Sequence, residues 1–472
     1  MSFHREMFKL KRESTQLALI GLALLVCMSL YFLIPDKILA HSPRLTLSFV
    51  IMAIILYALQ LLPSGYTSIV ILMLFSIFDL APPNVIFSLW LSPMIYLVIS
   101  AFFLAKAVEK SGLAQRLALY MFRPFVKNYR TLIILIYGVG IIFSLIIPHP
   151  FARAFIMLAI VKSIWDQMEL SKEERASVGL SVFVAASVNS FIFLTGDSVL
   201  NISTAELAGE AVTWLGWFIL MGPPSIGLNI LVCLTHLLVF RPKTKSQSLE
   251  FKDDQISIKP MNMEEKKVLF WLTLAIILWA TDLWHGIHPA WVGVIAITGL
   301  AMPRIGGLLK AEDFKAVPID ILFFMTAALA IGNVVVHTTL SETLANWIMP
   351  DLALANPMLI GLLLTAIGIF IHFFVGSAFA LISLLIPIFV TYLEAFSIEP
   401  MVGAMIIYLC SKAQWFFPFH LMDVMIGLGE KNGGYTQKPV VILGSVMIVP
   451  LLISVALFYI PWWQWIDAFY TK

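Results

Sequence analysis

The sequence predicts an all-α polytopic membrane protein made of two inverted-topology repeats, with about 11 transmembrane helices and two re-entrant hairpins. Three observations support this fold class. The chain is 60% hydrophobic and 12% charged, about half the charged fraction of a soluble domain. Apolar runs long enough to cross a bilayer recur along the whole chain. Two of these runs are too long for one span and are interrupted near their middle.

The first interrupted run extends from Thr131 to Val161 and contains one charged side chain, Arg153. A single crossing needs only about 20 apolar residues. A helix does not continue normally through Pro148 and Pro150, which lack an N–H group. Irregular backbone at membrane depth persists only where protein buries it or water fills a cavity beside it. Residues 131–161 are therefore predicted to form a re-entrant hairpin whose tip is a candidate site.

Basic residues in the connecting segments orient the predicted spans by the positive-inside rule. They place the N-terminus and the hairpin entrance at 131 in the cytoplasm, and the C-terminus outside. The loop Asn201–Val212 has no Lys or Arg and is predicted to be external. The second interrupted run, 358–391, is predicted to enter from outside. The predicted spans are 17–34, 45–62, 68–80, 90–108, 176–199, 214–240, 268–283, 289–302, 319–336, 402–428 and 440–460.

The two halves of the chain match at a nearly constant offset. Pro63 and Pro289 lie 226 residues apart, as do Asp197 and Asp423. Inverted repeats whose broken helices meet near the midplane are typical of secondary transporters. The predicted organisation is a tail and first span (1–44), a first repeat (45–240), a cytoplasmic linker (241–267), a second repeat (268–460) and a C-terminal tail (461–472).

Two segments carry a resemblance to a known family. They are Glu109-Lys110-Ser111-Gly112-Leu113 and the stretch 279–290, which opens the second half. Nearly the whole chain resembles the divalent anion/sodium symporters, which carry dicarboxylates, citrate or sulfate. The resemblance implies an elevator-type homodimer. The family's Ser-Asn-Thr tips and Thr-Pro-Pro-Asn-like turns are replaced here by residues 148–150, 376–378, 195–201 and 418–423.

Arg153 and two aspartates are the main candidates for chemistry. Arg153 is predicted to bind an anionic group beside a helix N-terminus, or else to pair with Asp197 or a hairpin carbonyl. If it binds the anion, Arg153→Ala abolishes substrate binding and leaves folding intact. Asp197 and Asp423 are predicted to take up a proton or coordinate a cation, or else to neutralise Lys412. A sodium site would also use backbone carbonyls of the unwound turns.

The remaining candidates are expected to line the substrate site, or else to be structural residues. The histidines among them can titrate near neutral pH. This group comprises His149, Pro150, Asn189, Ser190, Thr195, Gly376, Ser377, Lys412, Gln414 and His420. Cys27, Cys233 and Cys410 lie far apart without metal-ligand spacing, so no disulfide framework is expected.

The function predicted from these features is secondary active transport of a small anion bearing carboxylate, sulfate or phosphate groups. Protons or sodium would be the coupling ion, and no cofactor is expected. The expected partners are the lipid bilayer, the small-molecule anion and a second copy of the chain, with no nucleic acid. The short termini and compact loops favour a bacterial inner membrane.

Two alternatives come from other readings of the same residues. A cation/proton antiporter would use Asp197 and Asp423 alone, although a fixed charge at Arg153 would repel cations.

An intramembrane aspartyl protease needs a Gly-x-Gly-Asp motif and a Tyr-Asp partner. The sequence has Leu194-Thr195-Gly196-Asp197, without the first glycine, and no Tyr-Asp. No His-Glu-x-x-His zinc motif is present either. The chain is therefore predicted not to be an enzyme.

Overall fold

The computed structural model describes residues 2–122, 124–168, 170–209, 212–242, 260–348, 356–375, 377–394, 396–412, 422–430 and 432–470. Helices dominate this part of the chain, which confirms the all-helical prediction. They are α1 (Ser2–Leu33), α2 (His41–Ala58), α3 (Ser64–Ile77), α4 (Pro83–Ile86), α5 (Ser88–Leu91), α6 (Met94–Ser111), α7 (Leu113–Phe122), α8 (Tyr129–Ile146), α9 (Pro150–Trp165), α10 (Lys172–Val188), η1 (Asn189–Phe191), η2 (Leu194–Asp197), α11 (Leu200–Leu207), α12 (Trp214–Val239), α13 (Met263–Ala280), α14 (Asp282–His285), α15 (Pro289–Ala301), η3 (Ala311–Ala316), α16 (Ile319–His337), α17 (Leu340–Ile348), α18 (Pro357–Val375), α19 (Ala378–Glu394), α20 (Pro400–Cys410), α21 (Met422–Met425), α22 (Gln437–Val446), α23 (Ile448–Ser454), η4 (Val455–Tyr459) and α24 (Ile460–Trp465).

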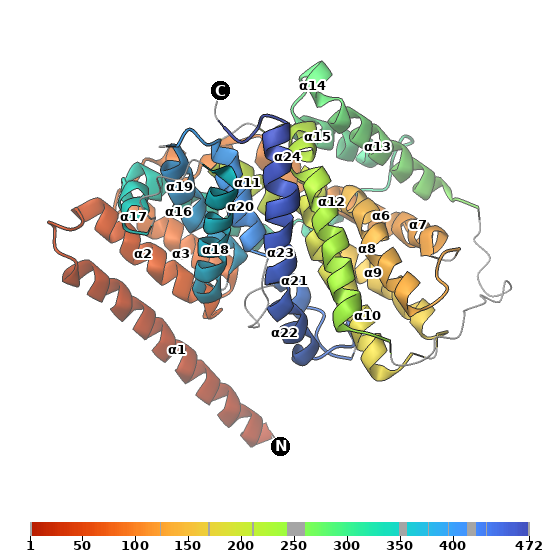
Figure 1. Cartoon of the computed structure of the whole chain (residues 1–472), viewed down its shortest axis with the longest axis horizontal. Coiled ribbons are helices and arrows are strands. Elements are labelled where there is room, and N and C mark those ends of the chain that lie inside the picture. Colours follow the sequence, from red (N-terminus) through yellow and green to blue (C-terminus); the bar gives the residue numbers. More distant parts are fainter. Residues whose placement is uncertain are drawn as a thin grey trace.

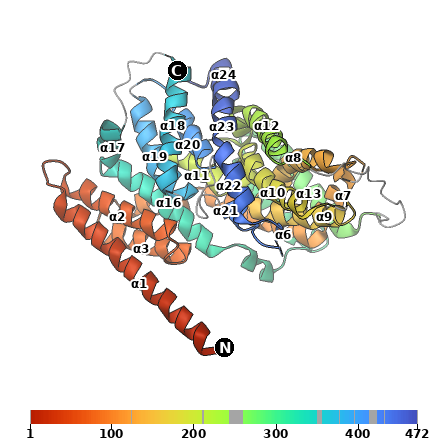
Figure 2. The ribbon, with the colours of Figure 1, turned by 60° about the horizontal axis from the view of Figure 1, so that its bottom comes forward.

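The helices form two lateral groups with a central group between them (Figure 1). One lateral group contains α2, α3, α16, α17 and α19, and the other contains α6, α7, α8, α9 and α13. The long helix α1 leaves the body as a diagonal rod in both views (Figure 2). Helix α12 and the continuous run α22 to α24 lie near the centre.

Among the residues that the structure describes, seven helices are long and apolar enough to cross a membrane. They are Ser14–Leu33, His41–Ala58, Tyr129–Ile146, Trp214–Val239, Ile319–His337, Pro357–Val375 and Gln437–Trp465. Many of their large apolar side chains are exposed, as a lipid-facing surface requires. The chain is therefore a multi-pass membrane protein.

The predicted break of the first hairpin is confirmed. A capping box at Asn128 begins α8, and α8 ends at Ile146. Ile147 has extended backbone (φ −118°, ψ 100°), the conformation that a residue before proline favours. Pro150 then occupies the first turn of α9, where its missing N–H costs no hydrogen bond. The two prolines thus divide residues 131–161 into two helices.

The second interrupted run also forms two helices, α18 and α19. The break lies between Val375 and Ala378. Gly376, which was predicted to form the break, lies outside the described residues. The Ser377 hydroxyl accepts a hydrogen bond from the Ala380 N–H at 3.4 Å, so this serine caps the start of α19.

Two predicted spans do not form single helices. The span 176–199 stops as a helix at Val188 and continues through η1 and η2. The described residues after it form α11, which is buried and is not the external loop predicted for 201–212. The side chain of Asn201 stabilises this turn, because its Nδ2 donates to the carbonyls of Ser190, Phe193 and Leu194. The span 402–428 likewise ends as a helix at Cys410, and residues 413–421 lie outside the described part.

Two close helix crossings join the halves of the chain. Helix α3 packs on α16, and α6 packs on α15. A Cβ atom at Gly65 would lie 2.9 Å from the Asp320 Cβ, and one at Gly293 would lie 3.0 Å from the Ser100 Cβ. Small residues at membrane helix interfaces allow such close backbone approach. The α3–α16 contact forms part of the wall that faces the hairpin tips.

Candidate functional site

A cavity of about 740 Å³ lies where the two hairpin tips meet the rest of the protein. Its volume is within the range of small-molecule sites. The residues that line it are Gln16, Tyr57, Gln60, Leu61, Leu62, Pro63, Ser64, His149, Pro150, Phe151, Asp197, Val199, Leu200, Asp320, Ile321, Phe324, Ser377, Ala378, Phe379 and Asp423. Five of them, His149, Pro150, Asp197, Ser377 and Asp423, were candidates from sequence. They come from four separate segments that the fold brings together.

Helix N-termini form one wall of the cavity. His149, Pro150 and Phe151 begin α9, and Ser377 and Ala378 begin α19. The first N–H groups of a helix have no intrahelical partner, and the helix dipole is positive at that end. The two tips therefore offer donors and partial positive charge to one shared space.

Arg153 lies behind this wall, fully buried, and is absent from the cavity lining. Its Nε donates to the Ala186 carbonyl at 3.1 Å, and one terminal nitrogen donates to Ile147 O at 3.2 Å. Further hydrogen bonds go to Gly196 O and to the Ser190 hydroxyl. Ile147 and Ala186 belong to the ends of α8 and α10, where carbonyls lack helical partners. These hydrogen bonds thus join the hairpin tip, α10 and η2 through the Arg153 side chain.

Lys412 lies between the two aspartates and is buried. Its Nζ is 3.0 Å from Asp197 Oδ2 and 3.6 Å from Asp423 Oδ2. The ammonium group also approaches the rings of Phe191 and Tyr408, with centroids at 5.5 and 5.7 Å. A buried lysine is stable only with such compensation. Lys412 therefore connects the turn after α10 with the segment after α20.

The two aspartates are held unequally. Asp197 Oδ1 accepts from the N–H groups of Val199 and Leu200 at 3.3 and 3.2 Å, which caps α11, and its Oδ2 accepts from Lys412. Within the described part of the chain, the buried Oδ2 of Asp423 accepts no hydrogen bond. The side chain of Asp423 is also more exposed, at 14% against 5% for Asp197.

The other predicted site residues fall into two groups. Asn189, Ser190 and Thr195 are buried and do not line the cavity. Asn189 Nδ2 donates to Tyr137 O at 3.1 Å, and Thr195 Oγ1 accepts from the Trp214 indole at 3.1 Å. These three residues pack the turns that carry the site. Gly376, Gln414 and His420 lie outside the described residues.

Sequence reasoning missed the wall opposite the tips. Tyr57 lies near the end of α2, Gln60 in the turn after it and Ser64 at the start of α3, and Asp320 and Phe324 lie in the first turns of α16. Pro63 was recognised only as one of two prolines 226 residues apart. Asp320, the second residue of the run that begins at Ile319, was the available signal, because intramembrane acids mark functional surfaces.

The cavity presents more negative than positive charge. Asp197, Asp423 and Asp320 line it, whereas the cations Arg153 and Lys412 lie behind the lining. Any anion that enters must therefore bring a cation or a proton, or draw a buried cation forward. Among the described residues, no group of three or more His, Cys, Asp or Glu side chains could hold a metal ion.

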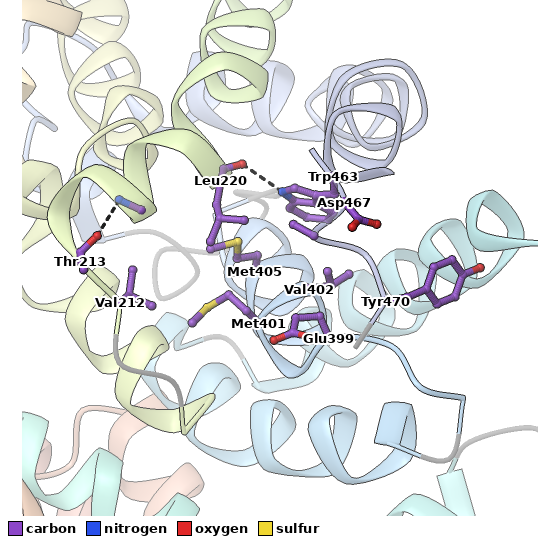
Figure 3. A pocket seen from close by; sticks show the side chains of 12 residues that line it. Val212, Thr213, Leu220, Glu399, Met401, Val402, Met405, Trp463, Asp467 and Tyr470 are labelled. Atoms are coloured by element: carbon purple, nitrogen blue, oxygen red, sulfur yellow. Dashed lines mark hydrogen bonds between the residues drawn. The ribbon is translucent and has the colours of Figure 1, made fainter. Parts of the chain in front are cut away.

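A second cavity of about 470 Å³ lies between the start of α12, α20 and the C-terminal segment. Figure 3 shows Met401, Met405 and Trp463 around it, with the Trp463 indole donating to Leu220 O at 3.0 Å. Its charged lining residues are Glu399 and Asp467. None of the residues predicted for the site lines it, so the cavity at the hairpin tips is the candidate site.

A multi-pass helical protein whose broken hairpins meet at a polar cavity has the architecture of a secondary transporter. The family model for the sodium:sulfate symporter transmembrane region matches residues 15–469. The chain therefore belongs to this family, which is a family of transporters and not of enzymes. The resemblance noted from the sequence is confirmed.

Several individual proteins are similar to this chain. A "Membrane protein" of Cupriavidus necator is 24% identical over 388 residues, covering 78% of this chain and 74% of the relative. The L-tartrate/succinate antiporters of Shigella dysenteriae and Escherichia coli K12 are 26% identical over 317 residues. That match spans 63% of this chain and 63% of those antiporters.

A solved structure supports the fold. The Alcanivorax borkumensis YdaH transporter matches with a TM-score of 0.55, covering 81% of this chain and 88% of that one. The two sequences are 17% identical, so this likeness concerns the fold alone. It confirms that the helices are arranged like those of a bacterial transporter.

Proposed function

We propose that this protein is a secondary active transporter that moves a small dicarboxylate-type anion across a bacterial inner membrane. The observation that carries the proposal is the cavity between the starts of α9 and α19 in a chain of this family. Helix N-termini bind carboxylate groups through free N–H donors and the dipole. The similarity to L-tartrate/succinate antiporters points to the same class of substrate.

Coupling follows from the charges of the cavity. A dianion among Asp197, Asp423 and Asp320 would be repelled unless positive charge arrived with it. Protons on the aspartates or a sodium ion at the unwound turns would supply that charge. The transporter is therefore proposed to couple anion movement to protons or sodium, or to exchange one anion for another.

The proposed movement is of the elevator type, between two inverted repeats at 45–240 and 268–460. Helices α3 and α6 correspond in order to α15 and α16, and the packing is exchanged, with α3 on α16 and α6 on α15. The pairs α8–α9 and α18–α19 correspond in the same way. Inverted repeats normally carry their substrate at the interface between them.

The proposal includes eleven spans, two hairpins, a cytoplasmic N-terminus, an external C-terminus and a homodimer. Crosslinking in membranes tests the dimer, and thiol labelling of terminal cysteines tests the orientation. Labelling of both termini from one side would contradict the odd number of spans.

The experiment for the substrate is uptake of labelled succinate or L-tartrate by vesicles that contain purified protein. Uptake above that of empty vesicles, driven by a counter-anion, a pH gradient or a sodium gradient, is expected. Unlabelled dicarboxylates should compete, and monocarboxylates of similar size should compete less. Absence of dicarboxylate uptake under all three driving forces would contradict the proposal.

The elevator movement is tested by crosslinking across the sliding interface. A Cβ at Gly332 on α16 would lie 3.4 Å from the Ser383 carbonyl oxygen on α19. In a background without native cysteines, a bridge between Gly332→Cys and Ser383→Cys should stop transport. A bridge between Ser100→Cys and Gly293→Cys, where α6 meets α15 within the scaffold, is the matched control and should be tolerated.

A cation/proton antiporter is the second candidate, and the acidic lining of the cavity favours it. The Arg153 guanidinium lies behind the lining, and the three carboxylates that line the cavity offset the repulsion that it exerts on cations. Cation flux without anion flux in the same vesicles would support this candidate. Dicarboxylate flux would reject it.

A further inference from the structure

We propose that Asp423 is the carboxylate that takes up the coupling proton, and that Lys412 is the positioning residue that makes this possible. The inference rests on the proposed transport function and assigns different roles to two aspartates that the repeat makes equivalent. Asp197 keeps its ion pair with the Lys412 ammonium group. Asp423 loses its contact with that group when it takes up the proton.

The contacts of the two carboxylates support this division. Asp197 accepts three hydrogen bonds, from Lys412 and from two backbone N–H groups at the start of α11. A substitution that removes these hydrogen bonds would leave the start of α11 without its cap and the buried Lys412 charge without its partner. Asp423 approaches Lys412 at 3.6 Å, which is longer than a hydrogen bond, and its buried Oδ2 accepts none within the described part of the chain. An oxygen in that position can accept a proton without losing a hydrogen bond.

Charged and titratable groups face Asp423 from several elements. They are Lys412 beyond α20, Asp197 in η2, His149 at the first hairpin tip, Arg153 in α9, Tyr408 in α20 and Asp320 across the cavity. With Asp197, Asp423, Arg153 and Lys412 ionised, these four groups sum to no net charge. An ionised Asp320 adds one negative charge across the cavity, in keeping with its acidic lining.

Entry of a dianion changes this balance. One proton from solvent binds Asp423 Oδ2 and forms an O–H bond, while Lys412 keeps its proton and stays paired with Asp197. Protonation raises the charge of the site by one, which compensates one charge of the anion. Release of the anion on the other side lets the Lys412 ammonium approach Asp423 again and expel the proton. His149 also faces the site, so the experiment must separate it from Asp423.

The experiment measures succinate uptake by vesicles between pH 5.5 and 8, for the wild type, Asp423→Asn, Asp197→Asn, His149→Gln and Asp320→Asn. Wild-type uptake should fall as pH rises, by up to about tenfold per pH unit where one proton limits the rate. Asp423→Asn should transport with a rate that no longer depends on pH. Asp320→Asn removes a carboxylate from the same cavity and should keep the wild-type slope, as should His149→Gln.

Proton uptake on binding provides a second readout that needs no transport. Succinate added to purified wild-type protein in weak buffer should take up protons, detected with an indicator dye, and Asp423→Asn should take up none. If Asp423→Asn does not fold, Asp423→Glu should restore both proton uptake and the pH slope, and a flat profile in Asp423→Glu would contradict the role.

The outcomes separate this inference from the proposed function. A pH slope retained in Asp423→Asn, or lost in His149→Gln instead, would overturn the role of Asp423 while dicarboxylate transport stood. Wild-type protein that neither binds nor transports dicarboxylates would overturn the proposed function itself. Uptake that is independent of pH in the wild type would overturn the inference and leave sodium or anion exchange as the driving force.

Discussion

Arg153 and Lys412 are two buried cations behind the same cavity, yet their surroundings differ in kind. Arg153 donates to backbone carbonyls and one hydroxyl, which are neutral at every pH. Lys412 approaches two carboxylates, whose charge depends on pH and on what enters the cavity. A cation whose partners are neutral at every pH is structural, whereas a cation whose partners ionise can change its pairing when their charge changes.

The largest effect is expected for Arg153→Ala. The substitution leaves the carbonyls of Ile147, Ala186 and Gly196 buried without this donor, at about 1–3 kcal/mol for each unsatisfied group. We expect a loss of stability of about 5 kcal/mol, measured as unfolding in detergent, with little change between pH 5 and 8. Arg153→Lys should recover part of it. Normal stability with lost substrate binding would instead restore Arg153 as an anion ligand.

Lys412→Met should cost about 3–4 kcal/mol at neutral pH, because it leaves buried carboxylates without their cation. Unlike Arg153→Ala, this variant should regain stability as the pH falls, because protonation of Asp197 or Asp423 removes the uncompensated charge. The measurement is the melting temperature of both variants at pH 5 and pH 8. An equal change of melting temperature with pH in both variants would contradict the proposed difference between Arg153 and Lys412.

Asp197→Asn should destabilise the protein by about 1–2 kcal/mol more than Asp423→Asn. The asparagine keeps part of the cap on α11 but loses the close contact with Lys412, whereas Asp423 makes only the longer one. Thermal unfolding of the two single variants in the same detergent gives the comparison. Equal destabilisation would mean that the two carboxylates share Lys412 evenly.

The smallest loss of stability is expected when the ion pair of a third cation is broken. This cation is Lys110, which is partly exposed at the end of α6. Its Nζ lies 2.9 Å from Asp313 Oδ2 in η3. Burial opposes ionisation of Asp313, but hydrogen bonds from Lys110 and the Lys310 N–H outweigh it and hold the pKa of this carboxyl below its usual value. A lowered pKa stabilises the fold above the ordinary carboxyl range, and this stability is lost as pH falls through the folded-state pKa.

Asp313→Asn should therefore reduce stability by less than about 1 kcal/mol at pH 7. The difference from the wild type should vanish at the lowest pH at which both remain folded, as measured by melting temperature across pH. A difference that grows with acidity would contradict the assignment of the charged form to the folded state.

The sequence predicted the parts of the fold that apolar length and proline determine. Both hairpin breaks follow from runs too long for one crossing, and Pro148 and Pro150 fix the first break. The ends of α10 at Val188 and of α20 at Cys410 were missed, because each is followed by only a short polar stretch, Asn189-Ser190 and Ser411-Lys412, within a longer apolar run. Hydrogen bonds from the Asn201 side chain to the carbonyls of Ser190, Phe193 and Leu194 stabilise the turn after α10, and hydropathy does not reveal them.

The site was predicted only in part, for a related physical reason. A repeat at a fixed offset paired Asp197 with Asp423, and the structure brings both to Lys412. The sequence could not tell whether Arg153 faces the cavity, because the choice depends on which carbonyls lie within reach after folding. The wall formed by Tyr57, Ser64 and Asp320 also required tertiary contacts, since α3 and α16 are distant in sequence.

The most direct test of the central claim is a density map of the protein with bound succinate or L-tartrate. The ligand is expected between the starts of α9 and α19, with a carboxylate near Phe151 and Ser377. Density for the ligand in the second cavity beside Met401 and Trp463, with the cavity at the hairpin tips unoccupied, would contradict the account.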